Sequence, residues 1–306
     1  MTPEMILSLL AAAIQSGTPV LYATLGEIFT ERSGILNLGV EGMMMVGALA
    51  GFLAAKATGS PALGFLAGGL CGALIAGIHA GVCLVFLGNQ VVSGLAVTIL
   101  GVNLANYLGT PYVGQRAPGF DPFPLPLLSK LPFFGPVFFN HDILVYISFC
   151  IPVLMWVFFR YTRWGLGVRA VGENPEAVSA AGLPVAGYRW AGVLVGGFFS
   201  GLGGAYLSLA YTHLWSKGLS AGRGWIAVAL VIFAFWRPGR AVLGAYLFGG
   251  VMAFQLRLQA MGTNLPSSLL LMLPYGLTVL VLVASSFKKH GTEAPAILGI
   301  NLEPPD

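Results

Sequence analysis

Acidic side chains gather in one short stretch of a chain that is otherwise strongly apolar. Glu27 and Glu31 are four residues apart, so they share one face if the stretch is helical, and Arg32 could neutralise one of them. Ionisable groups inside a membrane span are costly and mark functional sites by default. These three residues are therefore candidate gate residues, although an interfacial loop with a structural ion pair explains them equally well.

Two further polar residues, Asn37 and Glu41, follow among the glycines Gly34, Gly39 and Gly42. This pattern indicates a broken or re-entrant helix, which is tolerated at membrane depth where it lines a cavity or is buried in protein. Both residues are candidates for lining a solute pathway. Glu41 is also the one fair candidate for a proton-carrying carboxylate, so an ion-coupled secondary carrier of a small polar solute remains an alternative.

A second polar stripe lies in the apolar segment 91–109. Asn103 and Asn106 are three residues apart on one helix face, and Ser93 and Thr98 precede them. Amide groups can hydrogen-bond an uncharged polar solute such as a sugar ring or a base. They can equally bond neighbouring helices. We treat all four as candidate pathway residues.

The stretch from residue 169 to residue 185 is a polar island with the signals of one short, capped helix. Asn174 can accept a hydrogen bond from the first turn, and Pro175 fits the first helical position. Glu176 suits the positive end of the helix dipole, and Gly182 is typical of a helix end. The sequence predicts a helix over about 175–181 whose role is to touch something outside the spans.

Several chemistries are not supported by the sequence. There is no GxxxxGK[ST] motif for nucleotide binding, no HExxH motif and no GxSxG motif. The four histidines and three cysteines are scattered, without the spacing of metal ligands. We expect no catalytic residues, no metal site and no bound cofactor, and the chain is not expected to be an enzyme.

Composition defines the fold class. Charged residues make up 8% of the 306 residues, against about 25% in a soluble domain. Mean hydropathy is +0.84. The chain is therefore predicted to be an all-α, polytopic membrane helical bundle with eight to ten transmembrane helices. The apolar segments lie at 5–26, 38–55, 61–88, 91–109, 142–159, 190–212, 224–236, 241–259 and 268–287.

Charge places the connecting segments. The clusters Arg160/Arg163, Arg237/Arg240 and Lys288/Lys289 put the loop 160–189 in the cytoplasm by the positive-inside rule. The proline-rich loop 110–141 then lies outside, as a stiff cover or as a docking surface for an external partner. Residues 1–289 form a single transmembrane domain, and the tail 290–306 is expected to be disordered. No clustered basic face indicates nucleic-acid binding.

The motifs resemble one family. Residues 169–182 (RAVGENPEAVSAAG) look like the cytoplasmic loop of bacterial ABC importer permeases for branched-chain amino acids, ribose and nucleosides. Residues 31–42 (ERSGILNLGVEG) are similar to that family's signature after the first span. Residues 222–229 (GRGWIAVA) and 236–239 (WRPG) resemble its nucleoside or simple-sugar branch. Importers of this branch often pair two different permeases, and this short chain resembles the smaller one.

The resemblance implies a type II-like permease in the bacterial inner membrane that carries nucleosides or simple sugars. Its partners would be ABC ATPase subunits holding ATP and Mg²⁺, a second permease in a heterodimer, and an external substrate-binding protein or lipoprotein. Coupling to the ATPase would pass through the short helix and its flanks, namely Arg169, Glu173, Asn174, Pro175, Glu176, Ala177, Ala180, Ala181 and Gly182.

Overall fold

A computed structural model describes residues 3–263, 266–286 and 294–301. These residues are helical apart from loops and one isolated bridge between Arg116 and Leu214. The helices are α1 (Pro3–Arg32), α2 (Val40–Thr58), α3 (Pro61–Ala80), α4 (Gln90–Leu108), α5 (Phe134–Phe138), α6 (Ile143–Tyr161), α7 (Arg163–Glu173), α8 (Pro175–Ala180), α9 (Val185–Tyr206), α10 (Arg223–Ala234), α11 (Pro238–Ala260), α12 (Ser267–Leu271) and α13 (Leu273–Ser286). π-Helical turns, Gly81–Val85 and Leu207–Tyr211, extend α3 and α9.

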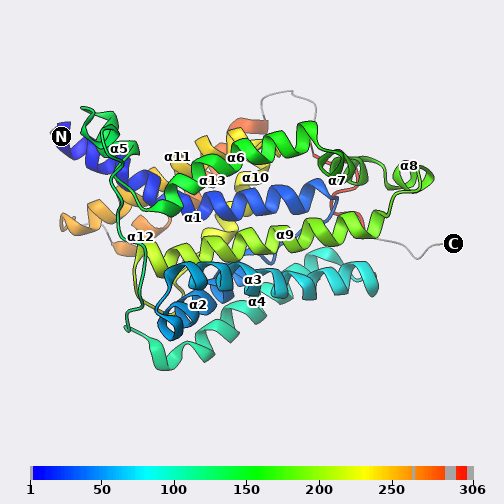
Figure 1. Cartoon of the computed structure of the whole chain (residues 1–306), viewed down its shortest axis with the longest axis horizontal. Coiled ribbons are helices and arrows are strands. Elements are labelled where there is room, and N and C mark those ends of the chain that lie inside the picture. The colour runs from blue at the N-terminus through cyan, green and yellow to red at the C-terminus, as the bar shows by residue number, and fades with distance from the viewer. Residues whose placement is uncertain (1–2, 264–265, 287–293, 302–306) are drawn as a thin grey trace.

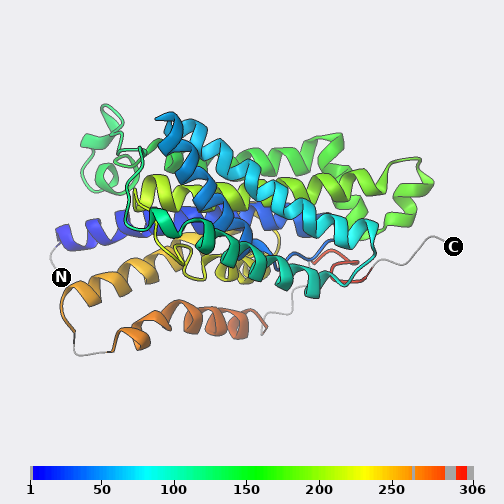
Figure 2. The same cartoon turned by 90° about the horizontal axis from the view of Figure 1, so that it is seen from below.

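Seven helices of the described residues are long and apolar enough to cross a membrane, and two shorter apolar helices, Arg223–Ala234 and Leu269–Val281, accompany them. Together they correspond to the nine apolar segments of the sequence. The all-α membrane bundle is therefore confirmed. Figure 2 shows α13, in dark orange, along one edge of the bundle.

Polar side chains fix where several helices begin. Asn89 accepts a hydrogen bond from Val92 N at the start of α4, and the Asp142 carboxylate accepts from Leu144 N and Val145 N at the start of α6. Thr162 does the same for Gly165 N in α7. Each cap satisfies donors that the first helical turn leaves without a partner.

Glycines let the central helices approach closely. A Cβ atom built on Gly72 would lie 2.3 Å from the Gly197 carbonyl oxygen, and one on Gly47 would lie 2.4 Å from that of Gly201. Small residues four apart allow backbones to touch in membrane helices. The glycine stripes of α3 and α9 thus pack α9 into the middle of the bundle, where it is the most buried of the seven long spans.

The two loops that the charge pattern assigned to opposite sides lie at opposite ends of the bundle. Figure 1 shows α5, within the 110–141 loop, at the same end as the N-terminus, and α8 at the other end. The loop is fastened over the outer end of α9, since Gly114 N donates to Trp215 O and Phe120 N donates to Leu209 O.

The tail differs from expectation where the structure describes it. Residues 294–301 pack against the end of the bundle that carries α8: Ile297 N donates to Gly172 O at 3.2 Å, and the Gln90 side-chain amide donates to Ile300 O at 2.8 Å. The expected disorder was wrong for these eight positions, because turns and hydrogen bonds with α7 and α4 hold them. Residues 290–293 and 302–306, the rest of that tail, lie outside the described residues.

Candidate functional site

The predicted short cytoplasmic helix is present as α8. The Asn174 side chain accepts a hydrogen bond from Ala177 N at 2.9 Å, and Pro175 occupies the first turn. At the other end Gly182 has φ +74°, and Leu183 N donates back to Val178 O at 3.2 Å. This is the glycine-terminated helix end that the sequence indicated.

The helix α8 turns most of its surface outward. Val178 is buried against the chain, whereas Glu176, Ala177, Ala180 and Ala181 are exposed. Beside it, an apolar groove of about 540 Å³ runs between α7, α8 and the start of α9. A short, rigid helix of small residues projecting from the membrane end can insert into a groove of a partner protein.

The flanking residues of α8 are placed differently from one another. Glu173 is exposed at the end of α7. Arg169 lies inside α7 and donates from Nη1 to Phe159 O at 3.3 Å, so it ties α7 to the end of α6. Arg169 therefore orients α7, which carries α8 at its far end.

The gate candidates form a buried hydrogen-bonded cluster rather than an open passage. The Glu27 carboxylate accepts from Asn37 Nδ2 at 3.0 Å and from Asn37 N at 3.2 Å. The Glu31 carboxylate accepts from the Trp236 indole N–H. Both carboxyl groups are buried. Through these hydrogen bonds the cluster joins α1, the non-helical residues 33–39 and the turn between α10 and α11.

Arg32 belongs to the same hydrogen-bonded cluster through the backbone carbonyl group of Trp236. Its Nε and Nη2 donate to the Trp236 carbonyl oxygen at 3.3 and 3.1 Å. That turn is unusual, because Phe235 and Trp236 both have positive φ, a conformation that non-glycine residues seldom adopt. Among the described residues, hydrogen bonds to an amide, an indole and a carbonyl hold this stretch.

Glu41 caps another helix. Its carboxylate accepts from Ser220 Oγ, from Gly222 N at 2.9 Å and from Gly224 N at 2.6 Å. Gly222 N and Gly224 N stand at the start of α10, where a carboxylate is favoured by both the free donors and the helix dipole. The geometry gives Glu41 a full set of partners inside the chain.

The predicted pathway residues on α4 divide into two groups. Ser93 bonds His79 Nδ1 of α3 at 2.9 Å, and Thr98 donates to Leu38 O in the non-helical residues 33–39 at 2.7 Å, so both are used in contacts within the chain. Asn106 accepts from Gly218 N at 3.0 Å. Asn103 is exposed and donates only to Ile99 O of its own helix among the hydrogen bonds of the described chain.

Sequence reasoning missed three polar residues that organise this region. Trp236 holds Glu31, and His79 joins Ser93 to Leu36 O at 3.1 Å. The buried Gln90 accepts from Leu36 N at 2.7 Å while its amide holds the tail. The available signal was their polarity within apolar segments, since buried polar groups need partners. No group of three or more potential metal ligands occurs among the described residues.

Several known proteins are similar to this chain over most of its length. The family described as the permease component of the branched-chain amino acid transport system matches residues 8–282. The chain is 44% identical, over 84% of its length and 79% of the relative's, to the "Putative glucose ABC transporter permease protein TsgC13" of Haloferax volcanii. It is 34% identical to the nucleoside ABC transporter permease protein NupC of Lactococcus lactis subsp. cremoris, over 87% of this chain and 88% of that one.

A solved structure shares the fold. It is entitled "An inward-facing conformation of a putative metal-chelate type ABC transporter" and matches with a TM-score of 0.50 and 15% sequence identity. The match covers 90% of this chain and 84% of that chain. At this level of identity the match shows the fold alone.

Proposed function

This chain belongs to the permease component family of branched-chain amino acid transport systems, and from that premise we propose that its solute is a nucleoside or a simple sugar. It is a multi-pass transmembrane subunit of an ABC transporter of the inner membrane, the part that forms the translocation pathway. The solute class is supported by relatives named for glucose and nucleoside transport. An ion-coupled carrier is not favoured by these relatives.

The observation that carries the mechanism is the exposed, doubly capped helix α8 at the cytoplasmic end. We propose that α8 inserts into a groove of a partner ATPase. ATP and Mg²⁺ would be held by that ATPase, since this chain has no P-loop motif and no catalytic role of its own. Closure of the ATPases would move α8 and shift the bundle between outward-open and inward-open states.

The pathway is proposed to follow the exposed face of α4. Asn103 and Tyr107 are four residues apart on that face and both are exposed in the single chain. An amide and a phenol together can hydrogen-bond the hydroxyl groups of a sugar or the edge of a base. This face would be completed by a second permease of different sequence, and an external binding protein or lipoprotein would deliver the solute.

A matched pair of substitutions tests the role of α8. In Ala177→Arg a bulky charge occupies the exposed face of α8, and we expect the ATPase to be lost from the purified complex while the permease stays folded. Ala62→Arg, at an exposed position near the outer end of the bundle, is the control and should retain the ATPase. Co-purification from membranes measures both. Equal ATPase recovery with Ala177→Arg and wild type would contradict the coupling role.

A further inference from the structure

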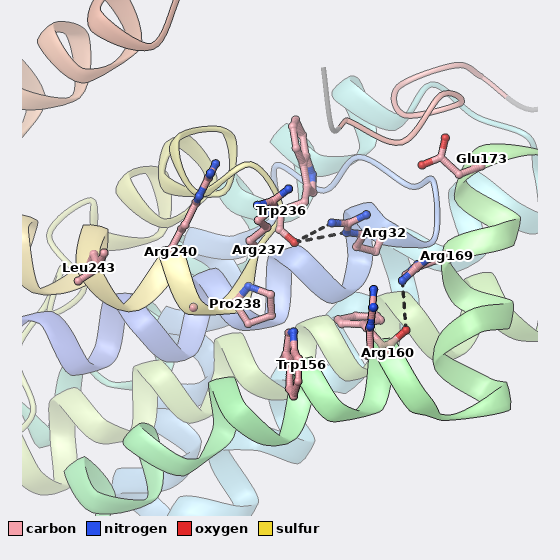
Figure 3. A pocket seen from close by; sticks show the side chains of 12 residues that line it. Arg32, Trp156, Arg160, Arg169, Glu173, Trp236, Arg237, Pro238, Arg240 and Leu243 are labelled. Carbon is pink, nitrogen blue, oxygen red and sulfur yellow. Dashed lines mark hydrogen bonds between the residues drawn. The ribbon is translucent and has the colours of Figure 1, made fainter. Parts of the chain in front are cut away.

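A cavity of about 830 Å³ opens at the end of the bundle that carries α8, and it shares Glu173 with the groove beside α8. It lies between the ends of α1, α6 and α7 and the turn that leads from α10 into α11 (Figure 3). Among the described residues, five arginines and one carboxylate, that of Glu173, line it; the arginines are Arg32, Arg160, Arg169, Arg237 and Arg240. Arg160, Arg169 and Arg240 bring positive charge to this cavity, because a guanidinium stays charged in proteins.

Several of these arginines are held in position by the fold. Arg32 donates to Trp236 O, Arg169 donates to Phe159 O, and the Arg240 guanidinium lies 5.1 Å from the centre of the Phe235 ring. In Figure 3, Arg160 of α6 and Arg169 of α7 extend toward the same space as Arg32. Guanidinium groups gathered in this way suit a ligand with several anionic oxygens, and phosphate is the common one.

The cavity sits at the level where a membrane gives way to water. Trp156 of α6 lines it and is 51% exposed, and Tyr161 and Trp164 follow at 69% and 62% exposed. Exposed tryptophan and tyrosine side chains concentrate at the headgroup level of a bilayer. Phosphate groups of lipids lie at this same level.

The outer surface that leads to the cavity is apolar. Leu154 of α6 and Leu243 of α11 are among the most exposed side chains of their helices, and Val153 and Leu247 of the same helices are exposed too. Figure 1 shows α6 and α4 on opposite sides of the bundle, so this surface is remote from the amide-bearing face of α4. It is suited to acyl chains rather than to a polar solute.

We propose that this arginine pocket binds the headgroup phosphate of one anionic phospholipid from the cytoplasmic leaflet. The phosphodiester oxygens would be bound by Arg160, while Arg240 on another wall of the cavity adds positive charge and Trp156 and Leu243 contact the first carbons of the acyl chains. The site is separate from the solute pathway and does not depend on which solute is carried. It ties the lipid to α7, which bears α8, and to the α10–α11 turn.

The test uses the detergent-purified importer and native mass spectrometry. The delipidated complex is titrated with dioleoylphosphatidylglycerol, with dioleoylphosphatidylcholine and with inorganic phosphate. We expect phosphatidylglycerol to bind more tightly than phosphatidylcholine, by at least about tenfold. The double variant Arg160→Gln/Arg240→Gln should lose about tenfold in phosphatidylglycerol affinity or more. The phosphatidylglycerol affinity of Arg160→Lys/Arg240→Lys, which keeps the charge, should lie between those of the wild type and the glutamine variant.

The control removes the same charge from the outer loop, where Arg116→Gln/Lys130→Gln should bind phosphatidylglycerol as the wild type does. Three results would overturn the proposal: equal binding of the two lipids, equal affinity losses in the pocket and control variants, or displacement of phosphatidylglycerol by an equal concentration of inorganic phosphate. The last result would assign the pocket to a soluble phosphate.

Discussion

Glu27, Glu31 and Glu41 of the first two helices are held in place by hydrogen-bond donors from other segments of the chain. Glu27 is held by Asn37, Glu31 by Trp236, and Glu41 by the start of α10. A buried carboxylate without such donors would lower the stability of the fold by roughly several kcal/mol. These acids therefore join α1, α2, α10 and α11 into one unit.

Glu41 is predicted to be a stabilising residue. Glu41→Gln replaces one carboxylate oxygen by an NH₂ group that faces N–H donors, so stability should fall by about 1.5–3 kcal/mol. Thermal unfolding of the purified complex measures the loss, and Glu176→Gln, at an exposed position, is the control. An unchanged unfolding temperature in Glu41→Gln would contradict the capping role.

Asn103 is predicted to act on transport rather than on stability. Its side chain is exposed and bonds only its own helix among the described contacts, so Asn103→Ala should leave assembly intact and lower uptake by about two- to tenfold, as expected for one lost hydrogen bond.

Uptake of labelled nucleosides and glucose by reconstituted vesicles measures this effect. Val92→Ala changes an exposed apolar residue of the same helix and is the matched control. If Asn103→Ala transports at the wild-type rate, α4 does not line the pathway as proposed.

At the residue scale, the sequence identified the polar residues but not their roles. Spacing alone showed that Glu27 and Glu31 share a face. It could not show that Trp236, 205 residues beyond Glu31, donates to it, or that Ser220, 179 residues beyond Glu41, does the same there. Contacts of this kind depend on how whole helices pack, and no local pattern encodes them.

At the element scale, local signals were sufficient for α8. Its cap, its first-turn proline and its terminal glycine lie within nine consecutive residues, so the sequence alone placed the helix. The tail shows the opposite case. Residues 294–301 have little helical or strand pattern, and they are ordered by hydrogen bonds to Gly172 and Gln90 that only the folded chain supplies.

The packing of α3 against α9 can be tested with two glycines of α3. A Cβ atom on Gly72 would collide with the α9 backbone at 2.3 Å, whereas one on Gly77 would lie 3.6 Å from Leu194, an ordinary contact. Gly72→Ala should therefore cost about 1–3 kcal/mol of stability, and Gly77→Ala should cost little.

Thermal unfolding of the two alanine variants in the same detergent compares them directly. We expect a lower unfolding temperature for Gly72→Ala and an unchanged one for Gly77→Ala. Equal temperatures would mean that the α3–α9 contact is looser than the structure shows.

At the scale of the whole molecule, the surfaces of the bundle differ in chemistry. Among mostly apolar exposed side chains, α4 carries the exposed amide of Asn103 and phenol of Tyr107, α6 and α11 expose apolar and aromatic groups, and α8 lies at one end of the bundle. We propose that these three surfaces serve the solute, a lipid and the ATPase. In the proposed coupling, motion applied at α8 would pass to α7, which Arg169 joins to the end of α6, and would reach the spans as rigid-body movement.

Reconstitution in vesicles tests whether uptake is coupled to an ATPase. Uptake of labelled nucleosides and glucose is measured for the complete importer, for the complex without its ATPase, and for the complete importer with ion gradients collapsed. We expect ATP-dependent uptake only with the complete importer, and we expect its rate to be unchanged when the ion gradients are collapsed. Uptake by this chain without an ATPase, driven by an ion gradient, would contradict it.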